Sequence, residues 1–174
     1  MTASSLFAGL GKTLLRKKGQ FVFQQGDVNT SIYICQSGLL KAYYLTPDGK
    51  ELVKSFIQEG EFIGSLIACH LAEPATFSLM CLEDCSLKRI PFSALQAIAE
   101  NNPEVSSLMT KALIDLAIKK ERREFEFLCL SAPERYALFK QRAPNLIDRV
   151  TQNDIARYLG ITPVALSRIK HHDT

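Results

Sequence analysis

The 174-residue sequence has no apolar run of the length that a membrane span needs, which is about 18 consecutive residues. It also lacks the pattern of a secretory signal, because the basic Arg16, Lys17 and Lys18 follow the first apolar residues instead of preceding them. We therefore expect a soluble, cytoplasmic protein without a membrane partner.

Cysteine is scarce, and its count of 5 is odd. Scattered cysteines with apolar neighbours do not resemble the disulfide framework of a secreted domain, so we expect most of them to be small buried side chains. Cys81 and Cys85 form a C-x3-C pair in a run that alternates like one strand. A metal or redox role for this pair is the less favoured alternative.

The groups needed for catalysis are few. The 3 histidines are His70, His171 and His172, and two of them lie at the C-terminus, so they cannot form the multi-histidine metal site of a cupin enzyme. There is no nucleophile-base constellation and no Walker glycine loop. We expect no enzyme activity, no cofactor and no metal; phosphate binding by residues 60–64 is a weak alternative.

Charge is unevenly distributed, although the net charge is only +3. Residues 131–174 carry 7 Lys and Arg against 4 Asp and Glu, and the rest of the chain is balanced at 14 against 14. A local positive excess of this kind favours DNA phosphates, while an ordinary solvated basic segment is the alternative.

Residues 19–90 have the rhythm of short antiparallel strands. Runs rich in aromatic and β-branched residues, at 20–23, 31–35 and 39–45, alternate with turn signals. Pro47-Asp48-Gly49-Lys50 is the clearest hairpin turn. This pattern predicts an antiparallel roll or barrel.

After Pro91 the periodicity becomes helical, with a short helix at 92–99 and a long one at about 103–130. The long helix is apolar on most sides and therefore needs two packing partners. One is the chain's own β-roll, and we expect the other to be the same helix of a second subunit; burial within one larger domain is the alternative. The predicted dimerisation residues are Leu108, Met109, Ala112 and Leu116.

Three further helices are predicted at 134–141, 152–159 and 163–171, after a hinge near residues 129–133. The last two have the features of a helix-turn-helix. Thr151 and Asp154 cap the first helix, Gly160 suits a left-handed turn, and Thr162 caps the second helix. An ordinary helical hairpin is the alternative, but all these features occur in register.

The second helix of this pair is the candidate recognition helix. Leu166 and Ile169 point inward, which leaves polar and small side chains for a major groove. Arg168 is the predicted base reader because its guanidinium group can donate twice to guanine. The predicted DNA-binding residues are Thr162, Val164, Ser167, Arg168 and Lys170.

The chain resembles the Crp/Fnr family of transcription regulators over nearly its full length. The matching residues are Lys18-Gly19-Gln20, Gln25-Gly26-Asp27, Ile32-Tyr33-Ile34, Ser37-Gly38, Asp48-Gly49-Lys50-Glu51 and Gly60-Glu61-Phe62-Ile63-Gly64. The resemblance implies an α+β protein with a double-stranded β-roll, a long dimer helix and a C-terminal winged helix-turn-helix. It also implies a homodimer that binds a palindromic operator and could contact RNA polymerase.

Departures from the family pattern limit the effector. The resemblance places effector contacts at Gly60, Glu61, Phe62, Gly64 and Thr76, but the expected phosphate-binding arginine is missing from residues 73–76, where Glu73 adds an acid. We therefore expect an unidentified effector rather than cyclic AMP. No cysteine precedes Cys35, so an iron–sulfur cluster is not supported, and His70 alone is weak evidence for haem.

The predicted domains are a sensor at 1–102, a dimerisation helix at 103–130 and a DNA-binding domain at 131–174. Because the sequence ends at Thr174, we expect any wing strand before the helix pair, in residues 146–151. The competing function is a ligand-responsive β-roll that acts on a protein partner without DNA.

Overall fold

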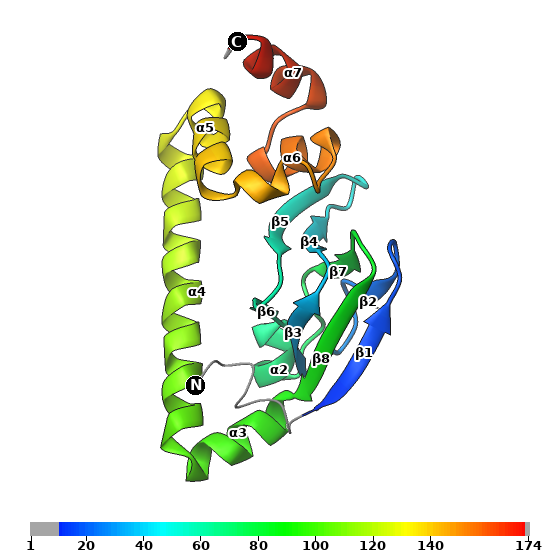
Figure 1. Ribbon diagram of the computed structural model, residues 1–174, viewed down its shortest axis with the longest axis vertical. Coiled ribbons are helices and arrows are strands. Elements are labelled where there is room, and N and C mark those ends of the chain that lie inside the picture. Colours follow the sequence, from blue (N-terminus) through cyan, green and yellow to red (C-terminus); the bar gives the residue numbers. More distant parts are fainter. Residues whose placement is uncertain (1–10, 173–174) are drawn as a thin grey trace. The chain divides into compact units, whose positions relative to one another are not determined.

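The computed structural model describes residues 11–172. They form two compact units, one that extends to Lys111 and one that begins at Ala112. The helix α4, Pro103–Cys129, begins in the first unit and ends in the second, and Figure 1 shows it as one continuous helix.

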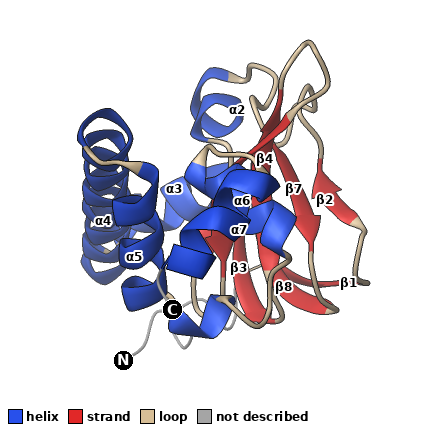
Figure 2. Ribbon diagram, turned by 90° about the horizontal axis from the view of Figure 1, so that it is seen from above, coloured by secondary structure: helices blue, strands red, loops and turns tan. Residues whose placement is uncertain are grey.

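The first unit contains two four-stranded sheets that are antiparallel throughout, drawn in red in Figure 2. One has the order β1-β8-β3-β6 and the other β2-β7-β4-β5. The strand bounds are β1 Lys12–Arg16, β2 Phe21–Phe23, β3 Ser31–Ser37, β4 Leu40–Leu45, β5 Glu51–Ile57, β6 Phe62–Ile63, β7 Ser78–Cys81 and β8 Cys85–Pro91. The prediction of an antiparallel roll is confirmed.

The predicted hairpin at residues 47–50 joins β4 to β5. Thr46 Oγ1 accepts from the Lys50 backbone N–H at 3.0 Å, and Gly49 has the positive φ of 80° that the turn needs. Leu40 and Ala42 of β4 point into the core between the sheets. The turn therefore fixes the register that buries this face.

The core of the first unit is aromatic. The ring of Phe23 lies 5.2 Å from that of Phe77 and 6.0 Å from that of Tyr33, measured between centroids. Leu79 and Leu87 complete the packing from β7 and β8. Side chains of this chain thus occupy the space between the two sheets.

The helices after β8 have bounds close to the predicted ones, whereas a helix between β6 and β7 was not predicted. Within the first unit are α2, Leu66–Leu71, and α3, Phe92–Asn101, and a small cluster of Ile90, Leu95, Val105 and Met109 packs the start of α4 against β8 and α3. The second unit adds α5 Ala132–Arg142, the 3-10 helix η1 Pro144–Leu146, α6 Gln152–Leu159 and α7 Pro163–His172. None of the helices in residues 11–172 has the length and apolar character of a membrane span.

Candidate nucleic-acid interface

The helix α6 begins at the predicted cap. Thr151 Oγ1 accepts from the Asp154 backbone N–H at 3.1 Å and donates to the Asp154 carboxylate at 2.8 Å. The Asp154 side chain is buried, and its charge lies in the first turn, where it complements the helix dipole. This reciprocal contact fixes where α6 starts.

The turn between α6 and α7 is also the predicted one. Gly160 has φ 70°, and the backbone N–H of Ile161 donates to the Ala156 carbonyl at 3.0 Å. Thr162 Oγ1 then accepts from the Ala165 N–H at 3.2 Å and caps α7. Two capped helices separated by a left-handed glycine are the geometry of a helix-turn-helix.

Burial divides the helix pair into an inner and an outer face. Leu166 of α7 is buried, as the sequence predicted, and Ala156 and Leu159 of α6 are buried as well. All five predicted DNA contacts lie on the exposed side, where Val164 has 63% of its surface accessible: Thr162, Val164, Ser167, Arg168 and Lys170. Their contact with DNA stays a prediction, but their exposure meets its first requirement.

Lys170 connects the two helices on this exposed side. Its Nζ donates to Gln152 Oε1 at 3.2 Å, so the ammonium group lies beside the first residue of α6. Helix N-termini and ammonium groups are both favourable partners of DNA phosphates. Lys170 is therefore better placed for the DNA backbone than for a base edge.

The predicted wing strand in residues 146–151 is wrong. Residues 144–146 form the 3-10 helix η1, and the Val150 N–H donates to the Leu146 carbonyl at 3.0 Å, which continues a compact turn instead of an extended strand. Leu146 and Val150 are buried, so their apolar character serves packing. A short run with apolar residues at both ends satisfies a strand and a compact turn equally well, so the sequence pattern alone could not separate the two.

Gly160→Ala should destabilise the helix pair. An ideal Cβ at this position would lie 2.8 Å from Phe127 Cε1, and a positive φ costs a non-glycine residue roughly 1–2 kcal/mol. We expect a loss of unfolding free energy of about 2 kcal/mol in urea titration. Gly49→Ala is the matched control for φ alone, because nothing lies within 4 Å of its Cβ position; equal losses in both variants would contradict the steric contribution of Phe127.

The predicted effector residues have local structural roles. Glu61 Oε2 accepts from the Gln58 N–H at 2.8 Å, and Gly60 has φ 85° and donates to the Cys35 carbonyl at 2.8 Å. A Cβ at Gly64 would lie 2.5 Å from Ile32 Cδ1. Phe62 and Thr76 are exposed. These contacts explain the Gly-Glu segment as a turn of the roll, and its contact with an effector stays a prediction.

Three cysteines gather in the core of the roll. Cys35, Cys81 and Cys85 are buried, while Cys69 is half-buried and Cys129 is exposed. The sequence suggested that Cys81 and Cys85 lie in one strand, which is wrong, because β7 ends at Cys81 and β8 starts at Cys85. Within residues 11–172 no three His, Cys, Asp or Glu side chains come together as metal ligands.

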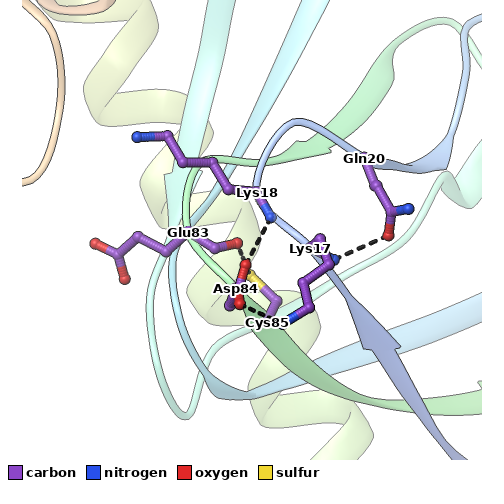
Figure 3. Close-up of polar contacts among 6 residues, drawn as sticks. All are labelled: Lys17, Lys18, Gln20, Glu83, Asp84 and Cys85. Atoms are coloured by element: carbon purple, nitrogen blue, oxygen red, sulfur yellow. Dashed lines mark hydrogen bonds and ion pairs between the residues drawn. The ribbon is translucent and has the colours of Figure 1, made fainter.

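The turn between β7 and β8 is bound by residues of the turn that follows β1 (Figure 3). Asp84 accepts from Lys17 Nζ at 2.7 Å and from the Lys18 N–H at 2.9 Å, and Cys85 Sγ contacts the Glu83 carbonyl at 3.3 Å. The hydrogen bonds from the Lys17 ammonium group and the Lys18 backbone N–H lower the pKa of Asp84. The hydrogen bond and charge attraction between Lys17 and Asp84 also raise the pKa of Lys17. The cluster joins two turns of the roll and has the character of a structural contact.

Thiol labelling should distinguish these cysteines. Burial raises the pKa of Cys81 to about 12, with the Cys85 thiol contributing, and burial also raises the pKa of Cys85. At pH 8 a pKa of about 12 leaves roughly one Cys81 thiol in 10⁴ ionised. Iodoacetamide followed by mass spectrometry should therefore modify Cys129 first and leave Cys81 and Cys85 intact until the protein unfolds. Early modification of Cys81 would contradict this arrangement.

Comparison with known proteins agrees with this architecture. Residues 15–102 match the family model described as the cyclic nucleotide-binding domain. The chain is 28% identical to the regulatory protein HlyX of Actinobacillus pleuropneumoniae, covering 88% of this chain and 68% of HlyX. It is 29% identical to the transcriptional activator protein anr of Pseudomonas aeruginosa, covering 88% of this chain and 66% of that protein. The chain thus spans about two thirds of the length of these relatives.

A solved structure supports the fold. FixK2 of Bradyrhizobium japonicum superposes with a TM-score of 0.82 at 18% identity, covering 94% of this chain and 84% of FixK2. The double sheet and the capped helix pair together define a protein with a β-roll of the cyclic-nucleotide-binding type and a helix-turn-helix. The chain belongs to the Crp/Fnr family of transcription regulators.

Proposed function

We propose that this chain is a sequence-specific DNA-binding transcription regulator and not an enzyme. The observation that carries the proposal is the α6–α7 pair, in which two caps and Gly160 fix a turn that exposes Arg168 and buries Leu166. In this arrangement Arg168 reads a guanine, and Val164 meets a thymine methyl group. Ser167, Lys170 and the Thr162 hydroxyl contact phosphates.

Crp/Fnr regulators act as homodimers, and α4 has an exposed apolar face for this purpose. Ile114, Ile118 and Phe125 are exposed, and Leu128 has 78% of its surface accessible. Successive members of this set are four, seven and three residues apart, as expected for the apolar a and d positions of a coiled coil, which we call the seam. Glu121 occupies the one seam position among them that is not apolar. We place the dimer contact on this face.

The four residues predicted for dimerisation lie largely on the other side of α4. At 3.6 residues per turn, Met109, Ala112 and Leu116 share a face with Val105, which is buried against β8 and α3. Leu108 lies at the edge of that face and is half-buried. In the proposed dimer Met109 packs within its own chain, while Ile114 and Ile118 meet the partner.

The functional division stays as the sequence suggested: sensor at 1–102, dimerisation helix at 103–130 and DNA-binding domain at 131–174. The sensor responds to an unidentified effector other than cyclic AMP. Glu61 already accepts a hydrogen bond from the backbone of its own loop, and residues 73–76 contain Glu73 but no arginine to bind a phosphate. Contact with RNA polymerase at a promoter completes the proposal. A DNA-binding role requires the compartment that holds the chromosome, so we place the protein in the cytoplasm.

Cyclic AMP should leave the protein unchanged. We expect less than a 2 °C shift of the melting temperature at millimolar cyclic AMP, because a nucleotide that binds only the native state would raise it by mass action. Cyclic GMP and cyclic di-GMP serve as comparison ligands. A concentration-dependent rise with cyclic AMP alone would contradict this part of the proposal.

The DNA-binding proposal is tested by selection from a randomised duplex pool at moderate salt, followed by sequencing. We expect enrichment of a two-fold-symmetric motif. Salt-sensitive retention of all sequences without enrichment would contradict sequence reading, because phosphate contacts alone carry no sequence information. Failure to retain any duplex at low salt would favour a β-roll that acts on a protein partner.

A further inference from the structure

The end of α4 is attached to the end of α6 by two arginines. Arg123 of α4 stacks on aromatic rings, with its Cζ 4.7 Å from the Phe127 ring centroid and 4.1 Å from that of Tyr158. Arg135 of α5 approaches the same Phe127 ring at 4.9 Å. All four side chains belong to the second unit and connect three of its helices.

The same guanidinium groups bind carbonyls at helix ends. Arg123 Nη2 donates to the Tyr158 carbonyl at 2.9 Å, and Arg135 Nε donates to the Leu159 carbonyl at 3.2 Å. Arg135 Nη1 also donates to the Leu130 carbonyl at 2.6 Å, just after α4. Carbonyls in the last turn of a helix lack intrahelical partners and carry negative partial charge, so they are favourable sites for a guanidinium group.

Phe127 also closes this contact against the turn of the helix pair. The Cβ position of Gly160 lies 2.8 Å from Phe127 Cε1, so only glycine lets the turn approach the ring. The connection between α4 and α5 is held as well: Glu126 pairs with Arg142, and the Ser131 N–H donates to Glu134 at 2.7 Å in a capping box. The sequence suggested a hinge at 129–133, but these contacts bracket that segment on both sides.

We propose that Arg123 and Arg135 are positioning residues that make the last turns of α4 and the helix-turn-helix one rigid body. This inference rests on the proposed function. In the dimer, the α4 seam would then set the distance and the rotation between the two α7 helices directly. Binding would therefore be sensitive to the spacing between the two operator half-sites. Any rotation of α4 would also rotate α7 by the same amount.

The test measures how strictly spacing is read. The operator found by selection is compared with the same operator carrying one extra central base pair, which rotates one half-site by about 34–36° relative to the other. For wild type we expect the insertion to weaken binding about tenfold or more. For the double variant Arg123→Ala/Arg135→Ala we expect less than about threefold weakening, because each helix pair can then reorient on its own α4.

Matched variants separate positioning from simple loss of stability. Arg122→Ala removes an exposed arginine from the neighbouring position of α4 and should keep the wild-type spacing ratio. Arg123→Lys keeps the charge but loses the planar group that stacks and donates, so its ratio should fall between those of wild type and the double variant. If the double variant does not fold, the Arg123→Lys ratio decides the question.

Each outcome has one meaning. If Arg123→Lys and any folded Arg123→Ala/Arg135→Ala protein lose as much affinity on insertion as wild type does, whatever their melting temperatures, the rigid connection is overturned and DNA binding is left intact. A selection with the wild-type protein that enriches no operator would instead overturn the proposed function.

Discussion

Ile118→Asp is expected to convert the protein into a monomer at micromolar concentration. Ile118 is exposed in the single chain and lies in the middle of the apolar seam of α4. Burying an isoleucine side chain contributes about 1.5–3 kcal/mol, and the substitution removes this contribution from both subunits while adding a carboxylate to each. Sedimentation velocity should show a dimer dissociation constant raised at least about 100-fold.

Operator affinity should fall with the dimer. A monomer engages one half-site and loses the effective concentration that the partner provides, so we expect a loss of about 100-fold or more at low protein concentration. Lys119→Asp is the control, because this exposed position lies away from the seam on the same helix. A dimer that survives Ile118→Asp but not Lys119→Asp would place the interface on another face of α4.

Arg168→Ala is expected to abolish discrimination at one base pair of each half-site. A bidentate contact of arginine with guanine contributes about 1–3 kcal/mol, and a dimer makes it twice. The operator should therefore bind about 30-fold or more weakly, while affinity for random duplex changes little. Repeating the selection with the variant protein should relax one symmetric pair of positions in the motif.

Lys170→Ala provides the contrast on the same helix. Its ammonium group lies beside Gln152 at the start of α6, the position of a phosphate contact. We expect uniform weakening on all sequences and a salt dependence reduced by about one ion per subunit. If Lys170→Ala relaxed a base preference and Arg168→Ala did not, the assigned roles of the two residues would be exchanged.

Local chemistry explains why the helix pair could be predicted. The residues that cap and end these helices act on the backbone within four residues of their own position, so their roles can be recognised from the sequence. They are Thr151, Asp154, Gly160 and Thr162. The hairpin at residues 47–50 was predictable for the same reason. The aromatic and β-branched residues at 31–35 likewise predicted the strand β3.

Contacts between distant segments explain what could not be predicted. The sequence shows that α4 is apolar on most sides, but only packing against Ile90 and Leu95 reveals which side the chain covers itself. In the sequence Arg123 and Arg135 look like ordinary solvated charges, and only the structure shows that they bind the carbonyls of Tyr158 and Leu159. The false wing strand had the same cause, because burial of Leu146 and Val150 comes from the fold around them.

Hydroxyl-radical footprinting of the wild-type protein on its selected operator tests the central claim most directly. A homodimer that reads DNA through α7 should protect two equivalent patches on one face of the duplex, centred about 10 base pairs apart, with two chains bound per duplex. A single patch, protection without two-fold symmetry, or one chain per duplex at saturation would contradict the account.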